Sequence, residues 1–329
     1  MLNQTPANRI ANETAMKTLN TFLLAAGIAF TGLAGPLQKT QVAADAKWVI
    51  HLDVEALLAT RIGSLLAREV VDPKLAKPTA DLKQHLGIDF DWRRIRSVTL
   101  YGSDFSASRN LRGVMLVDTD MDLAQAFEAA QKKLAEAGGL KNGALVRFEE
   151  GPSVLYSLKK ELYVATQKGP PVIVGKGREA VLKAREVLAG EAPNLSKVPF
   201  GKFCEVGNGF FFIAAAEGFS EAAPVPPQAR VLRMADGLRV VLGEKGDRVT
   251  ANLALSAKAA ETARQIHQVL QGMIALVALS QTENPDLQTL VGGAHVGLDN
   301  QTVTVDISLP VAKISQKLAE EERRKPTGN

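Results

Sequence analysis

The sequence predicts an α+β fold, in which a duplicated unit forms an antiparallel sheet backed by helices on one face. The segment 248–255 alternates apolar and polar residues, as expected for a strand with one buried face. A long amphipathic helix follows up to Leu279, and the spacing of its apolar residues predicts one stripe that faces the sheet. The residues of this stripe are Ile266, Val269, Leu270, Met273 and Val277.

The order of elements repeats along the chain. Residues 47–190 and 209–322 each read strand, helix, hairpin, helix, hairpin, helix, with a linker at 191–208 and a disordered tail at 323–329. The sequence leaves open whether the two copies share one sheet or form two packed domains.

The first copy is expected to bury the helix that follows its first hairpin. Phe127 and Leu134 should face the sheet, and Lys132 should be exposed, as should Gln268 in the second copy. The elements expected in order are a strand at 48–54, a helix at 55–70 ended by Asp72-Pro73, a loop to Thr79, a short helix at 81–86, a hairpin of 95–101 with 112–118, a helix at 123–137 stopped by Gly138-Gly139, strands between 144 and 175, and a helix at 178–188.

The second copy has its own turn signals. Asp299-Asn300 favours a two-residue hairpin turn, and Pro310 suits the first turn of a last helix. The other elements expected are a strand at 209–219, a short helix or turn at 230–235, and a hairpin whose turn spans 244–247.

Composition argues against nucleic-acid binding and disulfide scaffolds. The 329 residues include 39 basic and 35 acidic residues, and aromatic residues make up only 5%, which leaves few stacking platforms for bases. The single cysteine, Cys204, excludes an intramolecular disulfide and a multi-cysteine metal cage. We therefore predict no nucleic-acid partner, no cofactor and no metal.

The N-terminal segment resembles a signal peptide. Lys17 precedes an apolar run from Phe22 to Ala34, and Ala44 and Ala46 satisfy the small-residue rule for cleavage. We expect cleavage after Ala46, with Ala44 as the second choice, and an uncleaved anchor as the alternative. Residues 1–15 are then a leader extension, or the true start is Met16. The mature protein is expected to be periplasmic or secreted, without a transmembrane span.

Histidine and aspartate residues give the only catalytic candidates. His51 and Asp53 lie two apart on one predicted strand, and His295 on a distant strand could join them in an acid–base or metal cluster. A strand histidine that is hydrogen-bonded to a neighbour is the alternative.

Two further motifs suggest ion binding. Asp118, Asp120 and Asp122 resemble the start of a calcium loop, but Leu123 and Ala129 stand where that loop needs glycine and glutamate, so a helix cap is favoured. The run Gly175, Lys176, Gly177 and Arg178 could hold an anion at a helix N-terminus, but it lacks a complete phosphate-binding motif, so a tight turn with exposed charges is favoured.

Several stretches of the mature chain resemble a family of exported bacterial proteins with a duplicated α+β unit. They are WVIHLDVEALLATRIGSLL, LYG at a strand end, ETARQIHQVLQGMIALVAL and VTVDISLP. The resemblance implies export and repetition, and it brings no activity, catalytic residue or cofactor with it.

A chain of this length without a coherent set of acid, base, nucleophile or metal ligands more often binds than catalyses. We therefore expect a non-enzymatic envelope or secreted protein that binds a partner protein, or itself, through exposed sheet or helix surface. The alternative is a hydrolase whose site is assembled from residues distant in sequence.

Overall fold

The computed structural model describes residues 36–105, 113–136, 145–150, 153–158, 161–167, 169–219, 227–279 and 292–324. The predicted signal peptide and the Gly138-Gly139 helix stop lie outside these residues.

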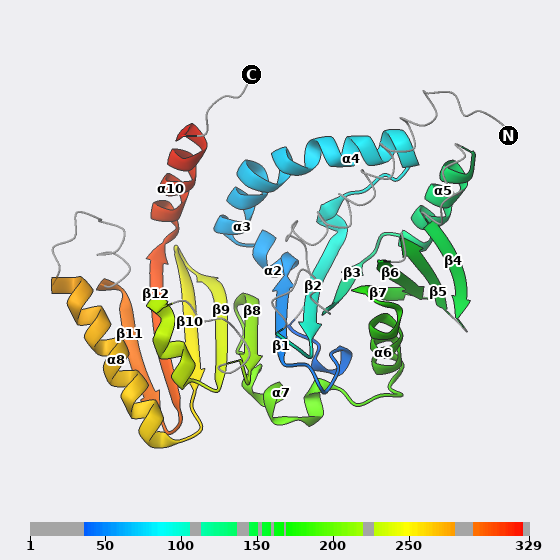
Figure 1. Ribbon diagram of the computed structural model, residues 1–329. Helices are drawn as coiled ribbons and strands as arrows, with labels where there is room; N and C mark the ends of the chain where they lie inside the picture. Colours follow the sequence, from blue (N-terminus) through cyan, green and yellow to red (C-terminus); the bar gives the residue numbers. More distant parts are fainter. Residues whose placement is uncertain are drawn as a thin grey trace.

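The described chain forms one open antiparallel sheet of twelve strands (Figure 1). The strand order is β11-β12-β10-β9-β8-β1-β2-β3-β7-β6-β5-β4. In chain order the strands are β1 Trp48–Asp53, β2 Ile95–Gly102, β3 Gly113–Thr119, β4 Leu145–Glu150, β5 Ser153–Leu158, β6 Leu162–Gln167, β7 Gly169–Lys176, β8 Phe210–Glu217, β9 Gly237–Lys245, β10 Arg248–Ser256, β11 Ala294–Asp299 and β12 Thr302–Pro310.

The two halves of the chain meet in the middle of this sheet. β1 pairs with β8, in a register that sets Val49 opposite Ala215, so both halves share one sheet. Outward from this seam, the first half runs β1-β2-β3-β7-β6 and the second runs β8-β9-β10-β12-β11. The first half adds β5 and β4 beyond β6.

Helices cover both faces of the sheet, so the prediction of helices on one face is wrong. In β3, Val114 and Leu116 belong to one core and Met115 and Val117 to another. Since successive strand residues point to opposite faces, this strand is buried on both sides. Its continuous apolar run is typical of a doubly covered strand.

One face, here called the α5 face, carries most of the helices. They are α2 Val54–Leu58, α3 Arg61–Leu66, α4 Asp72–Leu86, α5 Leu123–Glu136, the 3-10 helix η6 Pro227–Met234, α8 Ala260–Leu279 and α10 Val311–Arg324. Phe127 and Leu134 of α5 are buried on this face, as predicted.

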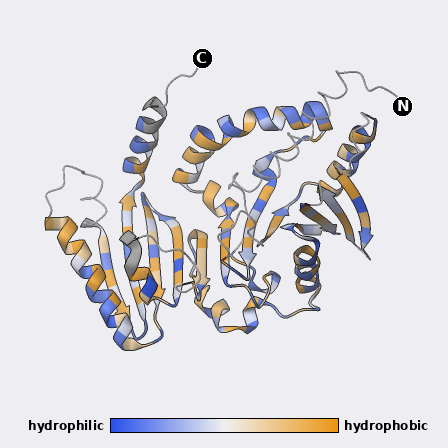
Figure 2. Cartoon of the chain, viewed as in Figure 1, coloured by the Kyte–Doolittle hydropathy of each residue, from blue (hydrophilic) through white to orange (hydrophobic). Residues whose placement is uncertain are grey.

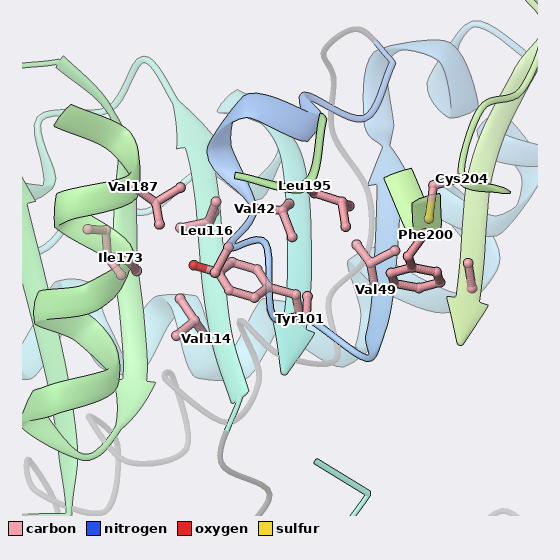
Figure 3. Packing of buried hydrophobic residues seen from close by; sticks show 14 of the residues in the cluster. Val42, Val49, Tyr101, Val114, Leu116, Ile173, Val187, Leu195, Phe200 and Cys204 are labelled. Carbon is pink, nitrogen blue, oxygen red and sulfur yellow. The ribbon is translucent and has the colours of Figure 1, made fainter. Parts of the chain in front are cut away.

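The opposite face, here called the α6 face, carries a second core that extends from β9 to β5, and Figure 3 shows part of it. Its covering elements are η1 Lys39–Gln41, α6 Arg178–Ala189, η5 Leu195–Lys197 and α7 Pro199–Phe203. On β10 and β12 the same face is polar, and Asn252 Nδ2 donates to Asp306 Oδ1 at 2.8 Å.

The helical region after β1 is longer than predicted. The loop expected up to Thr79 is instead part of α4, which continues from α3 through a π-helical turn, η2 Ala67–Val71. Pro73 lies in the first turn of α4, where a proline is tolerated, but Pro78 lies inside the helix. Burial of Leu75, Leu82 and Leu86 offsets the cost of that proline, which local sequence signals cannot reveal.

The segment before β1 belongs to the folded body. Val42, Ala43 and Ala46 are buried against the α6 face of the sheet. The segment predicted as a linker, 191–208, packs against them through Leu195, Phe200 and Cys204 (Figure 3). Residues 36–46, which are predicted to belong to the leader, therefore complete a core.

Candidate functional site

His51 and Asp53 lie together in a recess of ≈ 150 Å³ at the α6 face. His51 is buried, and its Nδ1 lies 2.8 Å from the hydroxyl oxygen of Thr99 on the neighbouring strand. Asp53 is also buried, and its Oδ1 accepts a hydrogen bond of 2.9 Å from the Ala56 backbone, which caps α2. The structure thus brings two of the three catalytic candidates together.

His295 lies on the same row of the sheet but far from the recess. The row runs from His51 through Ile213, Val241, Asn252 and Asp306 to His295. Five strand-to-strand steps separate its ends, roughly 24 Å. His295 is exposed near the sheet edge and does not join His51.

The residues that line the recess offer little for covalent chemistry. They are Pro36, Leu37, His51, Asp53, Ala56, Val206, Gly207, Asn208, Gly209, Phe210, Phe211, Phe212 and Ile213. Serine, threonine, cysteine and lysine are absent from this lining, and the hydroxyl group next to His51 is that of Thr99 on the neighbouring strand. Across the described part of the chain, no three His, Cys, Asp or Glu residues gather as metal ligands.

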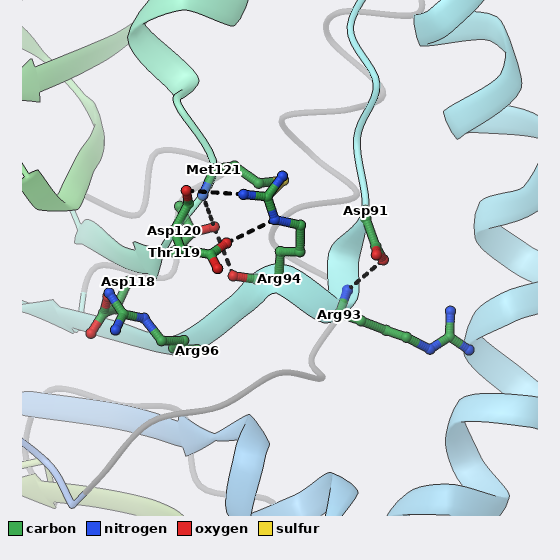
Figure 4. Close-up of polar contacts among 8 residues, drawn as sticks. All are labelled: Asp91, Arg93, Arg94, Arg96, Asp118, Thr119, Asp120 and Met121. Atoms are coloured by element: carbon green, nitrogen blue, oxygen red, sulfur yellow. Dashed lines mark hydrogen bonds and ion pairs between the residues drawn. The ribbon is translucent and has the colours of Figure 1, made fainter.

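The first two aspartates of the calcium-like run, Asp118 and Asp120, lie beside arginines (Figure 4). Asp118 pairs with Arg96 at 3.0 Å, and Asp120 pairs with Arg94 at 2.8 Å. Asp122 Oδ1 accepts from the Gln125 backbone at 2.9 Å and so caps α5. This arrangement agrees with the helix-cap interpretation.

The Gly175–Arg178 run forms the joint between β7 and α6. A Cβ on Gly175 would lie 2.9 Å from Val181 Cγ2, so this glycine permits close helix–sheet packing. Gly177 has a φ of 99°, which a side chain would strain. Close packing accounts for the glycine at 175, and the positive φ accounts for the glycine at 177. Lys176 and Arg178 are exposed at the joint.

Cys204 is buried against the sheet. Burial raises the pKa of its thiol to about 12, and the positive charge of Arg239 opposes that rise only in part. A thiol in this environment keeps its proton at neutral pH and is a packing residue.

Among the residues that the structure describes, most of the exposed large apolar residues are on α8. The side chains of Val269 and Met273 are 42% and 46% exposed, and those of Leu276 and Leu279 are 68% and 79% exposed. We call these four residues the α8 surface. The prediction that Val269 and Met273 are buried is wrong, because Ala263, Ile266 and Leu270 form the stripe that contacts the sheet.

The α8 surface extends from the side of the helix that contacts the sheet onto one flank. Val269 and Leu276 lie about 60° to 80° around the helix from Ile266, on one flank. Ala263 and Leu270, on the other flank, belong to the same core as Val231 and Leu232 of η6, which contacts α8. The exposed flank therefore faces outward past β11, where α8 lies along the sheet edge (Figure 1).

A sequence signal for this surface existed. From Gln271 to Leu279 the helix has no charged residue and is apolar on most sides, and the end of α8 is correspondingly apolar in Figure 2. Such a segment has no single apolar stripe, so periodicity alone could not choose the buried side. Among the described residues, no helix is both long and apolar enough to span a membrane.

The fold and its surfaces define an open-sheet α+β protein with an apolar helix surface at one sheet edge. No protein-family model matches the chain, and no curated protein matches it. Crystal structures of the Treponema protein TP0453 are similar over 87% of this chain. Crystal form IV covers 97% of TP0453 with 11% identity and a TM-score of 0.46, and crystal form III covers 98% with 12% identity and a TM-score of 0.47.

Proposed function

We propose that this chain is an exported, non-enzymatic binding protein that binds a protein partner through the α8 surface. The observation that carries the proposal is the exposure of four large apolar residues on one helix, between Val269 and Leu279. Burying one such side chain stabilises a contact by roughly 1.5 to 3 kcal/mol. Apolar surface gathered on one element commonly marks an interaction site.

The charges around the α8 surface favour a protein partner over a lipid surface. Helices that lie on anionic membranes are typically rich in Lys and Arg on their polar side. The polar side of α8 carries His267, Gln268 and Gln271, and its ion pair between Arg264 and Glu261 is near the N-terminal end. The partner that fits is therefore a protein with an uncharged apolar groove or helix.

The hydrolase alternative depends on the recess at His51 and Asp53. Its third candidate, His295, is five strands away, and the Asp53 carboxylate already caps α2. The recess does not favour a hydrolytic site over a binding role.

We also infer that the chain contains a duplicated unit. The shared strand order supports this, as does the position of α5 between β3 and β4 and of α8 between β10 and β11, on the same face. Superposition of the two halves in an experimental structure tests the inference, and failure of α5 to overlay α8 would contradict it.

Site-specific photo-cross-linking tests the binding surface. A benzophenone amino acid is placed at position 273 or 276 in the producing cell, and at the exposed position 268 as the control on the same helix. We expect one discrete protein adduct from 273 and 276, lost when Leu279→Gln is added, and none from 268. Adducts only with lipid, or equal adducts from all positions, would contradict the proposal.

Export is tested separately by fractionating the producing cells. The protein should be found in an envelope or culture fraction without residues 22–34. A cytoplasmic protein that retains these residues would contradict export and would leave the α8 test unaffected.

A further inference from the structure

We infer that two copies of this chain pair edge to edge through β11, about a twofold axis that passes by Gly297. The partner at this edge is a second copy of the chain, and the inference does not depend on the protein partner proposed for the α8 surface.

The two end strands of the sheet differ in how their edges are protected. Each has one strand neighbour among the described residues: β12 for β11 and β5 for β4. β4 carries Arg147 and Glu149, which form an ion pair of 2.7 Å, and charges of this kind discourage edge pairing. β11 reads AHVGLD and has no Lys, Arg or Pro, and its one acidic residue, Asp299, is at the end of the strand, so most of its backbone edge lacks the usual protection.

The side chains of β11 are complementary to those of a second β11 in one register. Alternation sets His295, Gly297 and Asp299 on the α6 face, and Val296 and Leu298 on the α5 face. In an antiparallel pair centred on Gly297, His295 lies opposite Asp299 of the partner subunit, and Val296 lies opposite Leu298 of the partner subunit.

In this register, side chains can make favourable contacts on both faces of the new strand pair. An imidazole N–H can donate to a carboxylate, and Asp299, whose Oδ1 accepts from Asn300 Nδ2 at 3.2 Å, keeps its other oxygen for that contact. Leu298, which is 39% exposed, gains an apolar neighbour. Moving the axis by one residue would set His295 opposite Gly297 or Gln301 of the partner subunit and lose the pair with Asp299.

The helices above the strands fit the same arrangement. α8 contacts both β11 and β12, and if its axis lies midway between these two strands, a pair of copies would hold the two α8 helices about two strand spacings apart. Two spacings are roughly 9.6 Å, within the usual 8–10 Å between packed helices. The exposed flank of α8 faces this seam, so Val269 would meet the partner helix.

The distal part of the α8 surface remains open in this pair. Val296, next to the axis, packs in the cluster that contains Ile266, so the helices approach at that level. Leu276 lies roughly 15 Å farther along the helix. Pairing through β11 and binding through Leu276 and Leu279 can therefore be tested independently.

Disulfide trapping tests the register with the full chain. In the double variant His295→Cys with Asp299→Cys, directly opposite residues are about 5 Å apart, within disulfide reach. We expect oxidation to yield a covalent dimer of the double variant that reductant reverses. Each single variant should stay monomeric on a denaturing gel, because like positions are roughly 13 Å apart. Cross-linking of the single variants as rapid as that of the double variant would overturn the register.

Sedimentation equilibrium tests the pairing without new cysteines. Leu298→Lys should weaken dimerisation at least tenfold, because it places a charge inside the seam. Phe148→Lys on β4 is a matched control, since Phe148 is 40% exposed at the opposite edge, and it should leave dimerisation unchanged. Met273→Gln should also leave it unchanged. A chain that stays monomeric at about 100 µM, or equal effects of both lysine variants, would overturn the inference.

Discussion

The backbone N–H of Leu195 donates a hydrogen bond of 2.8 Å to the carbonyl oxygen of Val42. This contact ties the segment before β1 to the segment that joins the two halves. Ala44 N donates to Pro193 O at 3.1 Å beside it, and both segments bury side chains in the same core. A chain that begins at Lys47 would lose one side of that core.

We therefore expect the mature N-terminus to precede Pro36. Gly32 and Ala34 satisfy the small-residue rule as well as Ala44 and Ala46 do, and a cut after Ala34 would keep the packed segment. N-terminal sequencing of the exported protein checks this. A variant that starts at Lys47 should lose roughly 3 kcal/mol or more of unfolding free energy, because it loses Val42, Ala43 and Ala46. A mature N-terminus at Lys47 with undiminished stability would contradict us.

The two helices α5 and α8 should respond differently to truncation. Phe127→Ala and Leu134→Ala should each lower the unfolding free energy by roughly 2 to 5 kcal/mol, because both side chains are buried. Val269→Ala and Met273→Ala should cost under about 1 kcal/mol, because these side chains are half exposed.

Urea denaturation of the four variants measures the difference. Lys132→Ala and Gln268→Ala are surface controls on the same two helices. If truncating Met273 cost as much as truncating Leu134, the assignment of the α8 surface would be wrong.

Substitution of Gly102 by a larger residue should destabilise the protein, because the indole of Trp48 packs against this glycine. A Cβ on Gly102 would lie 2.6 Å from Trp48 Cζ2, and the indole is held by a hydrogen bond of 2.8 Å from its Nε1 to the Asp104 carbonyl. Gly102→Ala should cost roughly 1 to 3 kcal/mol of unfolding free energy. Thermal melts compare it with Gly207→Ala, where a Cβ would meet nothing within 4 Å. Equal melting temperatures for both variants would argue against the close approach of Trp48.

The Cys204 thiol should be inert in the native protein. Burial raises its pKa from 9.0 to about 12, so almost no thiolate is present at pH 8. Iodoacetamide should label Cys204 only after unfolding, as followed by intact mass. Between pH 9 and 12 the native thiol keeps a proton that the unfolded one releases, so this group lowers stability as pH rises through that range. Rapid labelling of the native protein at pH 8 would contradict the buried position.

Local patterns in the sequence determined most elements of this protein. Alternation located strands such as β10, and apolar spacing located α5 with its buried Phe127 and Leu134. The Asp299-Asn300 turn followed from its residues, and Asn300 has a φ of 48°. These features depend on neighbours in the chain, which a sequence displays directly.

Contacts between distant segments were decided only by the tertiary structure. Pairing of β1 with β8 made one sheet of the two halves, and it set His51 and His295 five strands apart. Burial of Val42 and Ala46 came from contact with residues about 150 positions later. A helical segment that is apolar on most sides does not specify its own buried face. In α8 the buried face is therefore set by contact with η6 and the sheet, which leaves the other flank exposed.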